Sequence, residues 1–340
     1  MTRHSTGHRP RVVLTRTPLR VSFAGGGTDL SDFYEHDYGA VLSTAIDKYI
    51  YVTVKRHGEV FDERVRLSYS KSEGVATVEE VQNNIARECL RLLQIEPPIY
   101  ISTVGDLPAS TGLGGSSSFA VGLLNALHAF RGERVSAGQL AEEACHIEIE
   151  VLKEPIGKQD QYAAAFGGLN FLRFNPGGGV TVEPVRAKNG ALRNLFSHLM
   201  IFWTGHQRDT SHVLSEQKAN TARKMDHLFR MREHAHRLHS LVCNGHCDLE
   251  AFGGVLDETW QLKRQLAHTI SNQKIDAWYE RAIAAGAWGG KICGAGGGGF
   301  LLILAKPECQ EVIRHALLDL KEVPISYEVQ GSQAILPFLD

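Results

Sequence analysis

The residues best suited to chemistry in this 340-residue chain lie in three glycine-rich segments, at 18–30, 106–120 and 289–304. Glycine allows positive φ angles and a close approach of the backbone to a ligand, because it has no Cβ. The second segment, DLPASTGLGGSSSFA, is predicted to follow a strand and to lead into an apolar helix at 119–130. A glycine loop that leads into a helix directs free N–H groups and the positive end of the helix dipole at an anion. One interpretation of this loop is a triphosphate cradle whose serine hydroxyls could ligate a phosphate-bound metal, and the alternative is an ordinary tight turn.

Two common nucleotide motifs are excluded. A Walker A loop has Ser or Thr after its Gly-Lys pair, whereas the pair at 290–291 is followed by isoleucine. A GxGxxG pattern occurs at 294–299, but it follows a helical region and precedes a strand predicted at 300–305. That order is the reverse of the Rossmann order. We therefore predict that the third segment lets its backbone pass close to the second segment.

Two carboxylates stand out by their positions. A helix predicted from Ser136 to about Leu152 has an apolar stripe that is interrupted by Glu148. A carboxylate on a buried face is costly unless it is paired or bound to a metal. Asp160 opens a short helix at 160–166. The dipole of that helix favours the ionised carboxylate that a general base requires, while the alternative is a simple N-cap.

The elements that must position these groups alternate along the chain. Strands are predicted at 11–17, 19–24, 40–46, 49–56, 99–103, 169–174, 199–203 and 300–305, and in two short pieces within 325–337. Helices are predicted at 77–92 (with Thr77 as N-cap), 119–130, 136–152, 160–166 and 307–321, and through most of 210–283.

Composition narrows the classes of function. The length suggests about two domains, and 43% hydrophobic with 22% charged residues is typical of a globular protein. A formal net charge of −2 argues against nucleic acid and against an anionic membrane surface as partners. The first ten residues lack the apolar core of a secretory signal, and the six cysteines are scattered. We expect reduced thiols, a cytoplasmic location and small-molecule partners; the sequence does not indicate an oligomeric state.

Taken together, the motifs resemble those of the GHMP kinases, the family of galactokinase, homoserine kinase, mevalonate kinase and phosphomevalonate kinase. The first family motif, PxRVxxxGxxTD, matches Pro18, Arg20, Val21, Gly25, Thr28 and Asp29. The loop at 108–118 resembles the ATP loop, and 294–299 resembles the closing glycine motif. This resemblance implies an α+β fold, with an S5-like α/β N-terminal domain at 10–190 and a ferredoxin-like C-terminal domain at 191–340.

The resemblance also implies roles for individual residues. ATP would be bound by Pro108, Gly112, Leu113, Gly114, Gly115, Ser116, Ser117 and Ser118. Glu148 lies twelve positions before Asp160, as in galactokinase-like members. On this basis Ser116 and Glu148 would hold Mg²⁺, Asp160 would be the catalytic base, and Arg20 would lie beside it. The substrate would be bound by Gly26, Gly27, Thr28, Asp29, Lys158, Arg208, Gly294 and Gly296.

Departures from galactokinase indicate the substrate. Gly26-Gly27 replaces the Glu-His pair of galactokinase, which removes two sugar contacts and widens the pocket. Lys158 and Arg208 are candidate cations for a substrate phosphate, because a buried phosphate requires compensating charge. Four segments, at 25–30, 45–52, 155–168 and 291–300, look most similar to bacterial D-glycero-D-manno-heptose 7-phosphate kinases. The resemblance thus implies phosphorylation of that sugar at its anomeric hydroxyl, in heptose activation for cell-surface polysaccharide.

Three alternatives remain open at this point. An L-fucose kinase is the neighbouring branch of the same family. One GHMP branch uses ATP to drive a decarboxylation, and another contains non-catalytic sugar sensors. A sensor could lack Asp160 or the Mg²⁺ ligands, and this chain retains all of them.

One histidine-rich stretch contains residue types that bind zinc. His234, His236 and His239 are followed by cysteines at 243 and 247. Their spacing matches no tetrahedral pattern, so we interpret the stretch as the solvated face of a helix.

Overall fold

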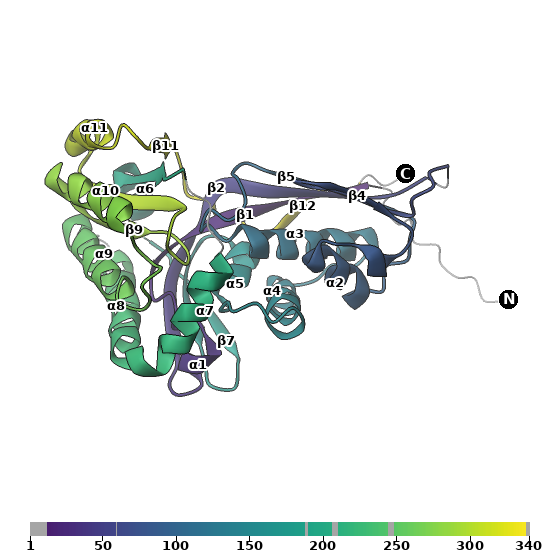
Figure 1. Ribbon diagram of the computed structural model, residues 1–340, viewed down its shortest axis with the longest axis horizontal. Coiled ribbons are helices and arrows are strands. Elements are labelled where there is room, and N and C mark those ends of the chain that lie inside the picture. Colours follow the sequence, from purple (N-terminus) through teal and green to yellow (C-terminus); the bar gives the residue numbers. More distant parts are fainter. Residues whose placement is uncertain (1–11, 59, 188–189, 206–209, 244–247, 338–340) are drawn as a thin grey trace.

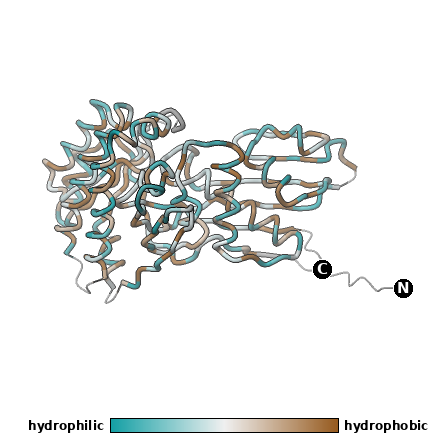
Figure 2. The backbone as a smooth tube through the Cα atoms, turned by 90° about the horizontal axis from the view of Figure 1, so that it is seen from below, coloured by the Kyte–Doolittle hydropathy of each residue, from teal (hydrophilic) through white to brown (hydrophobic). Residues whose placement is uncertain are grey.

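The computed structural model describes residues 12–58, 60–187, 190–205, 210–243 and 248–337. It is an α+β structure in which two sheets, each covered by helices, form two lobes of an elongated molecule (Figure 1). Apolar segments run through both lobes (Figure 2), and the buried residues form three clusters, of which the one that contains Phe23 and Phe252 includes residues of both lobes. Within the described ranges, no helix combines the length and the hydropathy needed to cross a membrane.

The first sheet has eight strands. They are β1 (Val12–Ala24), β2 (Gly39–Arg56), β3 (Val65–Ser68), β4 (Ser72–Val75), β5 (Ile99–Gly105), β6 (Leu169–Phe174), β7 (Val180–Pro184) and β12 (Gln333–Pro337). The main order is β12-β1-β2-β5-β3-β4, and β6 pairs with the first part of β2 and with β7. All pairs are antiparallel except β3 with β5. The long central pair β1–β2 therefore runs through the whole lobe.

One face of this sheet is covered by helices (Figure 1). The helical elements of this part are α1 (Ser31–Tyr34), the 3₁₀ turn Val78–Glu80, α2 (Asn84–Leu92), α3 (Gly115–Phe130), α4 (Ala137–Cys145), the π-helical turn His146–Val151 and α5 (Gln159–Phe166). The central helix α3 packs against β1 and β2 and also contacts α2, α4 and α5. Because it is surrounded on all sides, its apolar residues are buried almost all round, as the sequence predicts.

The second sheet has the antiparallel order β11-β8-β10-β9. Its strands are β8 (Leu199–Trp203), β9 (Ala287–Ile292), β10 (Phe300–Ala305) and β11 (Lys321–Val323). The helical elements of this part are α6 (Ala191–His198), α7 (Thr210–Asn220), the 3₁₀ turn Thr221–Lys224, α8 (Met225–Cys243), α9 (Leu249–Lys263), α10 (Gln273–Ala284) and α11 (Pro307–Ala316).

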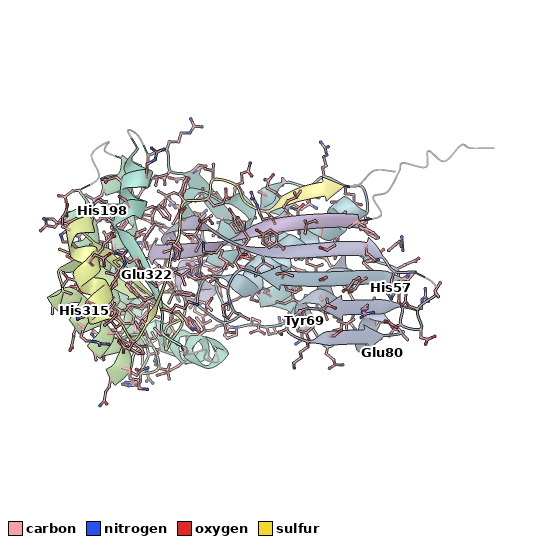
Figure 3. The ribbon with its side chains drawn as sticks, turned by 90° about the horizontal axis from the view of Figure 1, so that it is seen from above. His57, Tyr69, Glu80, His198, His315 and Glu322 are labelled. Carbon is pink, nitrogen blue, oxygen red and sulfur yellow. The ribbon has the colours of Figure 1, made fainter. Side chains whose placement is uncertain are left out.

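The two lobes meet along the second half of β1. Leu19, Val21 and Phe23 of this half pack in one apolar cluster with α8, α9 and the second sheet. The rings of Phe23 and Phe252 are in edge contact, with centroids 5.3 Å apart. Figure 3 shows the length of the molecule, with His57, Tyr69 and Glu80 toward one end and His198, His315 and Glu322 toward the other. A site at the junction can therefore take groups from both lobes.

Several predicted elements differ from those observed. The helix predicted over 77–92 is a 3₁₀ turn followed by a separate helix that starts after Asn83. The chain leaves the helical path because the Glu73 carboxylate accepts hydrogen bonds from the amides of Gln82 and Asn83, at 2.6 and 3.1 Å. The strands predicted at 11–17 and 19–24 are one strand with a register shift after Pro18, which has no amide hydrogen to donate.

The end of the chain also differs from the prediction. The division into domains at residue 190 stays a prediction, but β12 lies in the first sheet and pairs with β1 rather than with β8–β11. The preceding residues are not the strand predicted there, apart from one bridge between Ile46 and Tyr327. They lie against α5, where the Ser332 amide donates to the Ala164 carbonyl. Contacts between residues more than 160 positions apart therefore place this segment in the first lobe.

Candidate active site

The core of the site is an ion pair between β1 and α5. Arg20 donates from Nε to Oδ1 of Asp160 at 2.8 Å and from Nη2 to Oδ2 at 2.7 Å. The guanidinium is 4% exposed and the carboxylate 24% exposed, so only the carboxylate is accessible to a ligand. Asp160 lies in the first turn of α5 and is not its N-cap, which is Lys158. The structure thus brings Arg20 and Asp160 together, as the family resemblance implies.

The loop before α3 lies directly against this pair. Arg20 donates from Nη1 to the Gly112 carbonyl at 2.6 Å, and its amide donates to the Leu113 carbonyl at 3.1 Å. Gly114 caps α3 with φ +78, and a Cβ at this position would lie 3.2 Å from Cγ of Arg20 and 3.5 Å from Oδ2 of Asp160. Glycine is therefore needed both for the backbone angle and for the contact.

The third glycine segment passes close to the second, as predicted. A Cβ on Gly294 would lie 2.5 Å from Cα of Gly112, and a Cβ on Gly112 would lie 2.5 Å from the Cys293 carbonyl oxygen. A Cβ on Gly299 would lie 2.4 Å from the Thr111 carbonyl oxygen. The two loops are thus in backbone contact, which any side chain at these positions would disrupt.

The start of α3 offers donors and a buried carboxylate. The amides of residues 115–117 precede the first intrahelical bond, from Ser118 to the Gly114 carbonyl, so they have no acceptor within the helix. Ser116 Oγ donates to Oε1 of Glu148 at 2.6 Å, and Gln161 Nε2 donates to Oε2 at 2.7 Å. A Cβ at Gly115 would contact nothing within 4 Å, so the backbone here is open to a ligand.

Glu148 is fully buried in the π-helical turn that follows α4. Burial raises the pKa of its carboxyl above the ordinary value, while hydrogen bonds from Ser116, Ser117 and Gln161 act in the opposite direction. Within the described ranges no Lys, Arg or His forms an ion pair with Glu148. In addition, Oε1 of Gln161 is buried and has no hydrogen-bond partner there. A buried carboxylate with no cationic partner fits a metal ligand.

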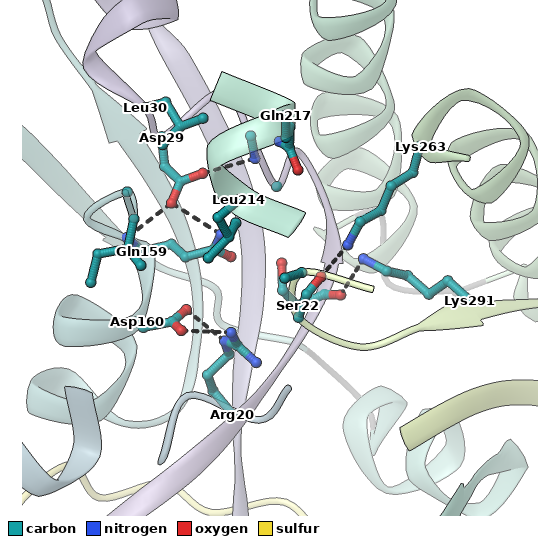
Figure 4. A pocket seen from close by; sticks show the side chains of 16 residues that line it. Arg20, Ser22, Asp29, Leu30, Gln159, Asp160, Leu214, Gln217, Lys263 and Lys291 are labelled. Atoms are coloured by element: carbon teal, nitrogen blue, oxygen red, sulfur yellow. Dashed lines mark hydrogen bonds and ion pairs between the residues drawn. The ribbon is translucent and has the colours of Figure 1, made fainter. Parts of the chain in front are cut away.

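A pocket adjoins the ion pair (Figure 4). It is lined by Arg20, Ser22, Gly26, Gly27, Asp29, Leu30, Ile156, Gly157, Gln159, Asp160, Leu214, Gln217, Lys263, Lys291, Gly294 and Ala295. None of the residues 108–118 lines it. Two of its buried polar atoms, Ser22 Oγ and Gln159 Oε1, form no hydrogen bond within the described part of the chain. They are available to the hydroxyl groups of a ligand.

Asp29 is held at the wall of this pocket by neutral donors. Its Oδ1 accepts from the Gly27 amide at 2.8 Å, and its Oδ2 accepts from Nε2 of Gln159 at 3.0 Å. Burial raises the pKa of its carboxyl, and the charge of Asp160 adds to this effect. Asp29 is thus a hydrogen-bonded carboxylate at the wall of this pocket, and the contact with a sugar hydroxyl that the resemblance implies stays a prediction.

The pocket contains two lysines that the sequence analysis did not assign. Lys263, the last residue of α9, is 5% exposed and donates to the Gly294 carbonyl. Lys291 of β9 is 2% exposed and donates to the carbonyls of Ser22 at 2.8 Å and Phe23 at 3.2 Å. The position of Lys291 within the third glycine-rich segment is a signal that could have identified it. Lys263 stands alone in a helical region, and no local pattern distinguishes it.

The predicted substrate residues divide into three groups. Gly26, Gly27, Asp29 and Gly294 line the pocket. Thr28, Gly296 and Lys158 do not line it. Arg208 lies outside the described residues.

The three residues outside the pocket have local packing roles. The Thr28 hydroxyl donates to the Gly25 carbonyl at 2.8 Å. A Cβ on Gly296 would meet Ile270. Lys158 Nζ donates to the Gly178 carbonyl at 2.6 Å. The ammonium group of Lys158 is thus engaged at Gly178 and is not part of the pocket lining, and contact of Lys158 with a bound substrate stays a prediction.

The predicted ATP-loop residues also differ in their surroundings. Around the start of α3, Gly114 and Gly115 are partly buried and Ser116 is exposed. Leu113 is fully buried in the apolar core, and Ser118 donates to the Pro18 carbonyl at 2.9 Å. Pro108 is exposed at the start of the loop, and Ser117 is buried. The accessible part of the loop is therefore centred on residues 114–116.

The histidine-rich helix is not a solvated face throughout. His234 is 3% exposed, and its Nδ1 lies 2.9 Å from the Thr259 hydroxyl of α9. It is buried because α8 packs against α9 at this point. No group of three metal-binding side chains occurs in the part of the chain that the structure describes.

Comparison with known proteins decides the family. Residues 77–168 match the model of the GHMP kinases N terminal domain, and residues 243–320 match that of the GHMP kinases C terminal domain. The two matches together cover half of the chain. The chain belongs to the GHMP kinase family. Its fold is the GHMP kinase fold, and it is accordingly an ATP-dependent phosphotransferase.

Individual relatives agree with this assignment. The D-glycero-alpha-D-manno-heptose 7-phosphate kinase of Campylobacter jejuni is 28% identical over 313 residues, covering 87% of this chain and 90% of the relative. The crystal structure of a D-glycero-D-manno-heptose 1-phosphate kinase from Bacteroides thetaiotaomicron covers 94% of this chain and 98% of that chain, with a TM-score of 0.77 and 24% identity. Galactokinase from Lactococcus lactis, solved with galactose, covers 97% of both chains with a TM-score of 0.75 and 18% identity. These two structures share the fold of this kinase.

Proposed function

We propose that this kinase transfers the γ-phosphoryl group of ATP to the anomeric hydroxyl of D-glycero-D-manno-heptose 7-phosphate. The product is the 1,7-bisphosphate, an early compound in the synthesis of nucleotide-activated heptose for lipopolysaccharide or other cell-surface polysaccharide. The name of the Campylobacter jejuni relative, which matches along nearly its whole length, supports this substrate. The consumption of ATP supports a cytoplasmic location.

One observation carries the proposal, namely the Arg20–Asp160 pair between the α3 loop and the pocket. An acceptor in the pocket presents its hydroxyl to Asp160, and a nucleotide on the loop presents its terminal phosphate beside the same carboxylate. Asp160 accepts the hydroxyl proton, the oxygen bonds to the γ-phosphorus, and ADP leaves. Both carboxylate oxygens accept from Arg20, but each retains a further lone pair for the proton.

Arg20 serves three functions in this arrangement. Its paired hydrogen bonds fix the orientation of Asp160, and its bond to the Gly112 carbonyl ties the base to the ATP loop. Its positive charge stabilises negative charge on the transferring group. Precise positioning of this kind is most of what a protein contributes to phosphoryl transfer.

Ser116 and Glu148 would hold Mg²⁺ beside the phosphates. The buried carboxylate without a cationic partner and the accessible start of α3 fit an ion with oxygen ligands. When bound, Mg²⁺ neutralises phosphate charge. The amides of residues 115–117 are directed at the same region and would bind phosphate oxygens through hydrogen bonds.

An L-fucose kinase is the second candidate. The L-fucokinase/L-fucose-1-P guanylyltransferase of Bacteroides fragilis is 24% identical over 355 residues, which cover 91% of this chain but only 36% of that protein. A fucose kinase acts on a sugar without a phosphate group. The two candidates are therefore separated by the need for a phosphate on the acceptor.

The test of the proposal is incubation with ATP, Mg²⁺ and a panel of sugars and sugar phosphates, with products identified by mass spectrometry. Heptose 1,7-bisphosphate and ADP in equal amounts are expected. If L-fucose or unphosphorylated heptose is converted as efficiently as heptose 7-phosphate, the proposed substrate is wrong. Carbon dioxide formed together with ADP would indicate a decarboxylase.

The role of Asp160 is tested by Asp160→Asn. General base catalysis contributes roughly 10²–10⁴ in rate, so kcat should fall by about that factor. Binding of ATP should persist, because the start of α3 is unchanged. Asp257→Asn provides a control, since Asp257 accepts from the Tyr279 hydroxyl away from the pocket. A fully active Asp160→Asn enzyme would falsify the assignment of the base.

A further inference from the structure

We infer that Lys263 and Lys291 together bind the phosphate group that the acceptor sugar already carries, and so select a phosphorylated sugar over an unphosphorylated one. This inference rests on the proposed function, because it identifies the residues that would recognise the phosphate of the proposed substrate. It assigns this role to neither Lys158 nor Arg208.

The first argument is the absence of carboxylate partners. Both lysines are more than nine-tenths buried, and in the described ranges neither forms an ion pair with Asp or Glu. Lys263 donates to one carbonyl and Lys291 to two. Since an ammonium group has three donors, three of the six donors have no acceptor in the described structure. Two buried cations in one pocket are costly unless an anion joins them.

The second argument is the place of the lysines in the pocket. Figure 4 shows the ends of both side chains directed toward Ser22, with Asp160 and Arg20 on the other side of that residue. The Ser22 hydroxyl is buried and has no hydrogen-bond partner in the described structure. A ligand that reaches from Asp160 past Ser22 to the lysines would place its reactive hydroxyl at one end and its anionic group at the other.

The third argument is charge. Three cationic side chains and two carboxylates line the pocket. Arg20 and Asp160 form an ion pair, and Asp29 is hydrogen-bonded by amides and not by a lysine. The two lysines are therefore the cations of the pocket that no carboxylate contacts, which suits a phosphate monoester with close to two negative charges at neutral pH.

The pKa values agree in direction with this geometry. Burial lowers the pKa of Lys263 to about 8, and it lowers that of Lys291 well below the ordinary value, with the charge of Lys263 adding to the effect on Lys291. The titratable and charged groups that face Lys263 are Arg20, Asp29, Asp160, Lys291 and Cys293. A bound dianion would restore the protonated form of both lysines.

The acceptor is a better source of this phosphate than the nucleotide. No residue of the loop 108–118 lines the pocket that contains the lysines. The start of α3, where the nucleotide phosphates would bind, contacts the Arg20–Asp160 pair through Gly114 and is not part of the pocket lining. The nucleotide remains the other source of a phosphate, and the experiment has to separate the two.

The test uses Lys263→Met, Lys291→Met and the double variant, with Lys274→Met, an exposed lysine of α10, as the matched control. Methionine has a similar volume without charge, so these variants should fold at least as stably as the wild type. The kinetic constants to measure are kcat/KM for heptose 7-phosphate, kcat/KM for unphosphorylated heptose, and KM for ATP. The wild type and each variant are compared at the same Mg²⁺ concentration.

A hydrogen bond between charged groups is strong, so each single variant should lose roughly 10- to 100-fold in kcat/KM for heptose 7-phosphate. The value for unphosphorylated heptose and the KM for ATP should change little. Equal losses on both sugars would show a structural role and overturn the inference. A rise in KM for ATP alone would show that the lysines serve the nucleotide, which also overturns it.

A binding measurement without turnover distinguishes failure of the inference from failure of the assigned reaction. Heptose 7-phosphate without ATP should raise the unfolding temperature of the wild type more than heptose does, and this difference should vanish in the double variant. If it persists there, the inference fails even for an active kinase. If the wild type forms no heptose 1,7-bisphosphate but the lysine-dependent binding is seen, the proposed function fails and the inference stands.

Discussion

Replacing Glu148 by glutamine should reduce the response to Mg²⁺ while leaving the fold intact or more stable. Glutamine keeps the shape of the side chain and can retain the contacts with Ser116 and Gln161, but it removes the buried charge. If Glu148 is only structural, the substitution should lower Tm and leave the Mg²⁺ dependence unchanged. If Glu148 is a metal ligand, the substitution should preserve or raise Tm and increase the Mg²⁺ concentration that the reaction needs. The substitution therefore separates the two roles of Glu148.

The expected magnitudes follow from the surroundings of the carboxylate. Glu148 is 0% exposed, and burial raises its pKa, so the ionised form costs the folded state free energy in the absence of a cation. Relief of that cost should stabilise the metal-free protein. For a chain of this size each kcal/mol of stabilisation raises Tm by roughly 1–2 °C, so a small rise in Tm is expected in EDTA.

The effect on activity should be much larger. Loss of a group that merely supports a metal ligand already costs roughly 10- to 100-fold in metal affinity or activity, and loss of a ligand should cost at least as much. Glu148→Gln should therefore need at least roughly 100-fold more Mg²⁺ for half-maximal rate. Mg²⁺ with ATP should raise the Tm of the wild type more than that of the variant.

The assay is ADP formation at saturating acceptor over a series of Mg²⁺ concentrations, together with thermal unfolding in EDTA. Glu150→Gln is the matched control, because Glu150 lies in the same π-helical turn but its side chain is 66% exposed. A Glu148→Gln enzyme with the wild-type Mg²⁺ dependence and a lower Tm would refute the reasoning. Glu148 would then be a structural residue alone.

Three further results are expected. Lys158→Ala should leave KM for heptose 7-phosphate nearly unchanged, because the Lys158 ammonium group donates to the Gly178 carbonyl outside the pocket. A selective rise in that KM would show that the side chain reaches the substrate. Gly26→Ala should fold normally, since the added Cβ would lie 3.6 Å from Nε2 of Gln159. The variant should raise KM for the sugar but not for ATP. If steady-state kinetics gives an unaltered KM for the sugar, Gly26 does not set the width of the pocket. Lys263, with its pKa lowered to about 8 mainly by burial, is protonated below that pH and loses its charge above it. The kcat/KM for heptose 7-phosphate should therefore fall above about pH 8 in the wild type, and this fall should be absent in Lys263→Met; a wild-type profile that stays level through this range would rule out a charged Lys263 in substrate binding.

Much of the catalytic centre follows from contiguous sequence. The loop at 108–118, the start of α3 and the first turn of α5 are local structures, and their glycines and caps can be identified from short patterns. The separation of Glu148 and Asp160 by twelve residues has meaning only through the family resemblance. That resemblance also implied the pairing of Arg20 with Asp160, 140 positions apart, which the structure contains. Through this resemblance the sequence therefore determined the phosphotransfer chemistry and named most of the groups that we propose around the reacting hydroxyl.

The tertiary structure decided which cations enter the acceptor pocket. Lys158 is adjacent to the catalytic segment in sequence, but the direction of a side chain at a helix start depends on the neighbouring backbone, and it points to Gly178. Lys263 and Lys291 come from the end of a helix and from a strand of the other lobe, and they meet only because α9 and β9 pack together. A single lysine in a helix or a strand has the local pattern of any exposed lysine. Its burial is a property of distant contacts, and such contacts are set by the packing of the two lobes along β1.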